Sequence, residues 1–219
     1  MAFNYLTINQ TNYADALLLQ EVLFEELLQS KGKEKPLKST LIFLQHSPVY
    51  TLGKSGDIKN LKVPIEETGA EYFKTNRGGD ITYHGPGQLT AYPIFDLEAF
   101  GMGVRQYVET LEDCVIDCIA TYGLKGSRID GASGVWLDPN TPNERKICAV
   151  GIKVSRGVTM HGLAFNINTD LSYFDNIVPC GLEDKGVSSL ANELGREMDF
   201  VEVEARLLKC FEDYFKVKN

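Results

Sequence analysis

The sequence predicts an α+β protein in which helices flank a mixed or mostly antiparallel sheet. Short apolar runs typical of strands cluster in the middle of the chain, helical patterns flank them, and the two do not strictly alternate. The 219 residues, 43% hydrophobic and 24% charged, fit a folded domain that spans residues 1–219. A chain of this length can bury a core without disulfides or metal ions.

Three segments have helical patterning. The first, 14–29, follows Asn12, a suitable N-cap residue. Its predicted apolar positions are Ala14, Leu17, Leu18, Val22, Leu27 and Leu28. The second, 104–119, carries Cys114 and Cys118 four residues apart, and we expect both thiols to pack in the core. The third spans 200–215.

Strand-like apolar runs fill most of the remaining sequence. They cover 40–45, 48–52, 71–75, 89–95, 134–136, 147–154 and 158–167. The lysine-rich segment 30–39 and the Asp-Pro-Asn-Thr-Pro-Asn sequence at 138–143 are predicted to be a loop and a turn.

Charge and cysteine usage exclude several classes of protein. The net charge of −8 argues against extended binding to nucleic acid, which requires a basic surface. Five cysteines without a CxxC pair indicate free thiols in a reducing compartment. The N-terminus lacks the pattern of a secretory signal, and no apolar run is long enough to cross a bilayer. We therefore expect a cytoplasmic protein with neither nucleic acid nor membrane as a partner.

The glycine-rich segment 77–94 is the most informative part of the chain. Arg77 precedes two glycines, and a Thr-Tyr-His sequence ending at His84 leads into Gly85-Pro86-Gly87. Glycines let a ligand approach the backbone closely, so the segment predicts a binding loop with Arg77 and His84 at its ends. The alternative is an ordinary hairpin turn whose glycines satisfy only the turn geometry.

Cys180 is the predicted nucleophile, because Pro179 and Gly181 place it on a tight turn. A thiolate needs a nearby cation, and Lys146 and His161 are the candidates. Lys153 is a rival base, but the alternation of its neighbours predicts that it points to the opposite or solvent face.

Two cofactor readings have little support. His84, His161 and Cys180 are far apart in sequence, lack the short local pairs common in zinc sites, and leave no fourth ligand. Gly101 and Gly103 are not followed by a third glycine at 106, so they form no dinucleotide motif. We expect no metal ion and no cofactor.

These motifs together resemble the octanoyltransferases of lipoate biosynthesis, the lipoyl(octanoyl) transferase family. The resemblance covers about residues 40–190 and rests on motifs in the expected order. They are Arg77-Gly78-Gly79, Thr82-Tyr83-His84, Gly85-Pro86-Gly87-Gln88, Tyr92, Lys146-Ile147, Gly151, His161-Gly162-Leu163-Ala164, Asn166 and Pro179-Cys180-Gly181.

The resemblance implies a fold similar to biotin- and lipoate-protein ligase catalytic domains. From the length of the chain we expect a monomer. The resemblance also implies that Cys180 takes an octanoyl group from octanoyl-acyl carrier protein, with Lys146 beside it. The acceptors would be lysines of lipoyl domains in 2-oxoacid dehydrogenase complexes and of the glycine cleavage H protein. The implied substrate-binding residues are Arg77, Gly78, Gly79, Asp80, Ile81, Thr82, Tyr83, His84, Ala149, Val150, Gly151, His161, Gly162, Leu163 and Ala164.

Two alternatives remain open at the level of the sequence. One is an ATP-dependent lipoate or biotin ligase on the same fold, which would gain nothing from an activated cysteine. The other is a carrier-protein-binding module without turnover.

Transfer of an acyl group passes through a tetrahedral intermediate that carries a negatively charged oxygen. Backbone N–H groups of the glycine loop or of residues 162–164 are candidates for stabilising this oxyanion.

Overall fold

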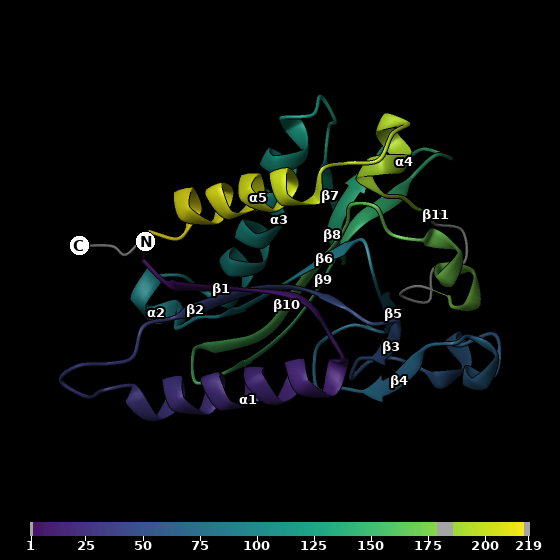
Figure 1. Ribbon diagram of the computed structural model, residues 1–219. Helices are drawn as coiled ribbons and strands as arrows, with labels where there is room; N and C mark the ends of the chain where they lie inside the picture. Colours follow the sequence, from purple (N-terminus) through teal and green to yellow (C-terminus); the bar gives the residue numbers. More distant parts are fainter. Residues whose placement is uncertain (1, 179–185, 217–219) are drawn as a thin grey trace.

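A computed structural model describes residues 2–178 and 186–216 and shows a mixed sheet with helices on both of its faces (Figure 1). The strands of this sheet follow the order β1-β2-β6-β10-β9-β8-β7, and β11 pairs with β9 beside β10. Their bounds are β1 Asn4–Thr11, β2 Thr40–His46, β6 Gln88–Ile94, β7 Ser127–Ile129, β8 Ala132–Leu137, β9 Arg145–Ser155, β10 Val158–Asn166 and β11 Gly186–Val187. The predicted fold class is confirmed.

The helices divide between the two faces of this sheet. Helix α1 (Tyr13–Ser30) covers one face, while α3 (Val104–Ala120) and α5 (Phe200–Tyr214) cover the other (Figure 1). Strands β6 and β10 are therefore buried along their whole lengths. This burial explains why they read as nearly continuous apolar runs rather than as alternating ones. Two short helices, α2 (Leu97–Phe100) and α4 (Leu190–Leu194), complete the described helices.

The edge strand β1 was not predicted from the sequence. It pairs in parallel with β2, from Asn4 opposite Thr40 onward, and makes the sheet mixed. Its sequence, NYLTINQT, is mostly exposed or half-buried and carries too few apolar residues to stand out as a strand. Strand β1 therefore forms because it pairs with β2, although its own sequence pattern does not indicate a strand.

Helix α1 forms where predicted, but its buried face does not follow the aliphatic pattern. The Asn12 side chain caps the helix by accepting a hydrogen bond from the Asp15 N–H. Two of the apolar positions in the pattern, Leu18 and Val22, are 60% and 47% exposed. The buried positions include Tyr13, Ala16, Gln20, Phe24 and Leu27. The aliphatic pattern alone therefore does not give the buried face, which is completed by a glutamine and two aromatic rings.

Helices α3 and α5 pack together over the main core. Cys114 and Cys118 are fully buried on α3, which confirms their predicted packing role. On α5 the buried side chains are Val203, Leu207 and Phe211. No described helix is long and apolar enough to span a membrane.

A second sheet, of order β4-β3-β5, contains residues 81–84 of the glycine-rich segment. It consists of β3 (Val49–Leu52), β4 (Glu71–Lys74) and β5 (Ile81–His84). Three short 3-10 helices lie outside both sheets, at Ile58–Asn60, Ile65–Glu67 and Leu171–Asn176. Residues 81–84, expected in the loop, thus form a strand that pairs with β3. Strand β5 pairs with β3, whereas β6 pairs with β2 and β10 in the main sheet, so residues 85–87 connect the two sheets rather than forming a hairpin turn.

Candidate active site

A β-bulge at Ile147 decides where Lys146 lies. Val135 pairs with Cys148 and Trp136 pairs with Lys146, so Ile147 is the extra residue on β9. Ile147 and Cys148 are consequently both buried in the core, although strict alternation would put them on opposite faces. The bulge changes the alternation, and Lys146 lines the same pocket as Ala149 and Gly151.

The Lys146 side chain is held by groups of strand β8. It is buried, its Nζ donates a hydrogen bond of 3.1 Å to the Ser133 carbonyl oxygen, and Nζ lies 4.5 Å from the centre of the Trp136 ring. An ammonium over an indole face is attracted by the negative charge of the ring face. Trp136 in turn donates from Nε1 to the Ala132 carbonyl oxygen at 2.9 Å. The cation is therefore fixed rather than extended into solvent.

Lys153 lies elsewhere on β9. Its Nζ is 4.9 Å from the centre of the Phe24 ring on α1, so the side chain packs under that helix. Of the two orientations predicted for Lys153, the opposite face or the solvent face, full exposure to solvent is not observed, because the half-buried side chain lies against α1. Lys153 is not among the residues that line the pocket containing Lys146.

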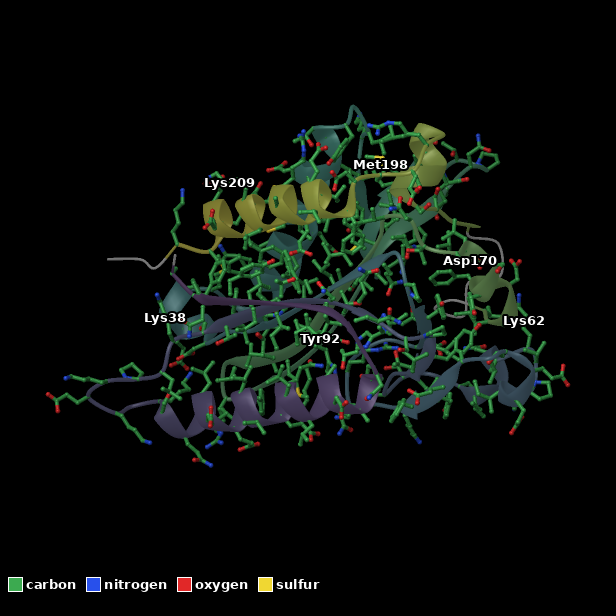
Figure 2. All side chains as sticks on the ribbon, in the orientation of Figure 1. Lys38, Lys62, Tyr92, Asp170, Met198 and Lys209 are labelled. Atoms are coloured by element: carbon green, nitrogen blue, oxygen red, sulfur yellow. The ribbon has the colours of Figure 1, made fainter. Side chains whose placement is uncertain are left out.

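His161 lines the pocket and has an unusual backbone conformation. It has φ of +61°, which few residues without a special role adopt. Its N–H donates to Gln20 Oε1 on α1 at 3.0 Å. The conformation directs the imidazole toward Tyr92, whose ring centre is 6.5 Å away. Tyr92 lies between the sheet and α1, in the middle of the molecule (Figure 2).

Arg77 is buried and ties the glycine loop to strand β3. Its Nη2 donates to the Thr51 carbonyl oxygen and, at 2.9 Å, to Thr51 Oγ1. Its Nη1 donates to the Gly78 carbonyl oxygen at 3.0 Å, and Gly78 N–H donates to the Ile152 carbonyl oxygen at 2.8 Å. The loop is thus anchored to both sheets, and the Gly78 N–H is already engaged.

A chain of buried hydrogen bonds runs from Arg77 through His84 to the segment after residue 185. Gln88 Nε2 donates to Tyr83 O and Asn166 Oδ1, so Gln88 Oε1 accepts from His84 Nδ1 at 2.8 Å. His84 Nε2 then accepts from Thr51 Oγ1 at 3.2 Å. Asn166 continues the chain by donating to the Ser188 carbonyl oxygen at 3.0 Å. This arrangement requires a neutral His84 in one tautomer.

All three histidines of the chain are held neutral by burial. Burial lowers the pKa of His46 to about 4. Burial, with Arg77 and Lys153 nearby, lowers the pKa of His161 to about 3. Burial, then His46 and Arg77, holds the pKa of His84 well below its usual value. Desolvation penalises the charged form of each imidazole. His161 is therefore a poor candidate for the cation that would stabilise a thiolate, which leaves Lys146.

These elements enclose a mostly apolar pocket of about 70 Å³. It brings together most of the predicted substrate-binding residues, namely Arg77, Gly79, Asp80, Ile81, Thr82, His84, Ala149, Val150, Gly151, His161, Gly162, Leu163 and Ala164, and it includes Lys146. Gly78 lies outside it, and the Tyr83 ring instead stacks on Tyr173 at 4.4 Å. Whether these residues contact a substrate stays a prediction.

Several lining residues were missed by the sequence reasoning. They include Tyr13 on α1, Thr90 on β6, Trp136 on β8, Phe174, Gly186 and Val187. Trp136 is the only tryptophan of the chain, and this rarity could have marked it as a candidate site residue. Tyr13 carried no such signal, because its approach to the pocket depends on how α1 packs.

The predicted nucleophile Cys180 lies outside the described residues, as do Pro179 and Gly181. The four described cysteines are unsuited to the role. Burial raises the pKa of Cys118 to about 12 and that of Cys210 to about 11, and it holds the pKa values of Cys114 and Cys148 well above their usual range. A thiol with a raised pKa forms little of the reactive thiolate. No three His, Cys, Asp or Glu side chains in the described part of the chain are placed to hold a metal ion.

Comparisons with solved structures identify the class of fold. A bipartite lipoate protein ligase from *Thermoplasma acidophilum* superposes with a TM-score of 0.70 at 16% identity, over 100% of this chain and 87% of that one. A biotin protein ligase from *Aquifex aeolicus* gives a TM-score of 0.55 at 15% identity, over 97% of this chain and 70% of that one. The fold is that of lipoate- and biotin-protein ligase catalytic domains, as expected.

Sequence comparisons identify the family. The model of the lipoyl protein ligase A/B catalytic domain matches residues 12–212. An octanoyltransferase of *Parabacteroides distasonis* is 52% identical over 218 residues, 98% of this chain and 99% of the relative. The chain therefore belongs to the lipoyl protein ligase A/B catalytic domain family and, within it, to the octanoyltransferases. The expected family is confirmed.

Proposed function

We propose that this protein moves an octanoyl group from octanoyl-acyl carrier protein, through a thioester on Cys180, to a lysine of a lipoyl domain. The observation that carries the proposal is the placement of Lys146, a buried cation at an apolar pocket in a member of the octanoyltransferase family. Val187 pairs with Lys146 on β9, and Gly186 and Val187 line the pocket, so a segment that begins six residues after Cys180 in the sequence lies at the pocket.

The first half of the reaction exchanges one thioester for another. The Cys180 thiolate attacks the octanoyl carbonyl carbon, the bond from carbon to the carrier sulfur breaks, and the leaving thiolate takes a proton from the Lys146 ammonium. An ammonium beside a thiol favours the thiolate, so Lys146 supports the attack before it gives up its proton.

The second half transfers the acyl group to nitrogen. The acceptor ammonium first loses a proton to solvent, and the neutral amine then attacks the carbonyl carbon. The carbon–sulfur bond to Cys180 breaks with its electron pair returning to sulfur. The proton released from the amine passes to neutral Lys146. The resting pair of thiolate and ammonium is thereby restored, and one lysine serves both steps without a metal ion or nucleotide.

The pocket fits the acyl group better than it fits a charged substrate. Its lining surface is mostly apolar. Among its polar residues, His84 donates to Gln88 and Gln88 donates to Asn166, while Arg77 donates to Thr51 and to the Gly78 carbonyl oxygen. An unbranched apolar chain gains free energy on entering such a site, because apolar surface leaves water.

The main alternative is an ATP-dependent ligase, because two structural relatives are lipoate and biotin ligases. A ligase activates a free acid with ATP, whereas the proposed transferase takes an acyl group that is already a thioester. The purified protein should therefore form a hydroxylamine-labile octanoyl adduct, visible by intact mass, when mixed with octanoyl-acyl carrier protein without ATP.

Variants locate that adduct. Cys180→Ala should abolish both the adduct and transfer to an apo lipoyl domain, whereas Cys114→Ala and Cys148→Ala should retain the adduct. A hydroxylamine-labile adduct on the Cys180→Ala protein would overturn the assignment. Formation of an octanoyl adduct only when free octanoate and ATP are supplied would favour the ligase.

A further inference from the structure

We infer that a groove on the outer side of Lys146 admits the acceptor lysine, and that Asp130 guides its ammonium group inward. The inference rests on the proposed function. The groove has a volume of about 620 Å³, compared with about 70 Å³ for the inner pocket. The two cavities share five lining residues, Gly79, Asp80, Lys146, Val150 and Gly151. A group that enters the groove therefore arrives at Lys146.

The groove exists because β8 pairs with only the first part of β9. The ladder between them ends at Gly134 and Ala149, while β9 continues to Ser155 and stays paired with β10. Beyond residue 149 the glycine loop contacts this edge of β9, because the Gly78 N–H donates a hydrogen bond to the Ile152 carbonyl oxygen. The groove lies between that loop and the turn at Asp130–Gly131 that joins β7 to β8.

The walls of the groove suit a slender chain. Half of its fourteen lining positions are glycine, alanine or serine. Small residues let an extended segment or a long side chain approach the backbone closely. A lysine side chain, with four methylene groups before its amine, has the required shape.

The charges in the lining select a cation over a phosphate. Asp80 and Asp130 are the acidic lining residues, and Lys146 is the basic one. Asp80 is engaged at the base of the loop, where it accepts from Ile81 N–H at 2.6 Å and from Asn60 Nδ2 at 2.5 Å. Asp130 is exposed at the rim, and its charge also acts on Arg105, which is ion-paired with Glu109. A rim carboxylate attracts an incoming ammonium and repels the phosphodiester of a carrier arm.

The test separates the two half-reactions. In the first, octanoyl-acyl carrier protein acylates the enzyme in a single turnover. In the second, isolated octanoyl-enzyme is mixed with an apo lipoyl domain under second-order conditions, and loss of the adduct is followed by intact mass. We expect Asp130→Lys to slow the second step about tenfold and to change the first less than twofold. The effect should shrink at high ionic strength, because salt screens exposed charges.

Two further variants complete the design. Glu25→Lys makes the same charge change on an exposed position of α1, across the sheet from α3, and should match the parent in both steps. Asp130→Asn removes the charge with little change in shape and should lie between the parent and Asp130→Lys. Equal transfer rates in Asp130→Lys and Glu25→Lys overturn the inference, as does a slowed first step with an unchanged second step. Absence of any adduct in the parent protein would count against the proposed function instead.

Discussion

Lys146 Nζ lies 4.5 Å from the centre of the Trp136 ring, with both residues buried between the pocket and the core. The Trp136 ring and the Ser133 carbonyl oxygen hold the ammonium on the pocket side of β9. This position is a consequence of the bulge at Ile147, which brings Lys146 onto the face of Ala149 and Gly151. Lys146, the proposed basic partner of Cys180, is thus positioned by β8 as much as by its own strand.

Replacing Lys146 by alanine should raise the apparent pKa of the Cys180 thiol, because removing a nearby cation disfavours the thiolate. The measurement is the rate of iodoacetamide labelling of Cys180 as a function of pH. Lys153→Ala is the matched control, since Lys153 packs against Phe24 outside the pocket. An unchanged labelling profile in Lys146→Ala would contradict the assignment of Lys146.

Trp136 should act as a positioning residue for Lys146. Trp136→Leu removes the aromatic face and should slow acylation about tenfold, as expected for a buried cation–π contact of roughly 1–2 kcal/mol. Trp136→Phe keeps an aromatic ring and should recover most of the rate. The pH profile of Cys180 labelling should move toward higher pH in Trp136→Leu only. Equal losses in both variants, with lowered thermal stability, would indicate a packing role alone.

Filling the pocket should discriminate between acyl chains by length. Gly79 is unsuitable for this test because its φ of +83° makes a valine there strained even where space exists. Ala149 lines the pocket on a regular strand, so Ala149→Leu should slow acylation by an octanoyl donor about tenfold or more and by a butanoyl donor much less. Ala99→Leu, on the exposed side of α2, is the control. Equal loss with both donors would place the acyl chain elsewhere.

The buried histidines should make the protein less stable in mild acid. The folded-state pKa of His46 is about 4, against an ordinary value of 6.5. Between these values the unfolded chain binds a proton that the folded chain does not. The free energy of unfolding therefore falls as pH decreases, by about 1.4 kcal/mol per pH unit for each such histidine. His46→Gln should have a shallower dependence between pH 6.5 and 4, measured by urea unfolding. A slope equal to that of the parent would show that His46 is protonated in the folded state.

The sequence by itself determined the positions of the three long helices and of most long strands, because apolar periodicity and turn residues are local signals. Helices 104–119 and 200–215 and the strands at 40–45, 89–95, 147–154 and 158–167 form where their patterns place them. The order of the motifs also determined the family, and most of the predicted binding segments lie around one pocket.

The tertiary structure decided what depends on pairing between distant segments. It added β1, whose sequence is unremarkable without β2, and it placed the buried face of α1 on Tyr13, Ala16, Gln20 and Phe24. It also put Lys146 in the pocket, because strict alternation along β9 would have sent this side chain to the opposite face. The bulge at Ile147 arises because Val135 and Trp136 of β8 pair with Cys148 and Lys146 of β9, which leaves Ile147 unpaired. Such a register depends on both strands, so the sequence of one strand does not predict it.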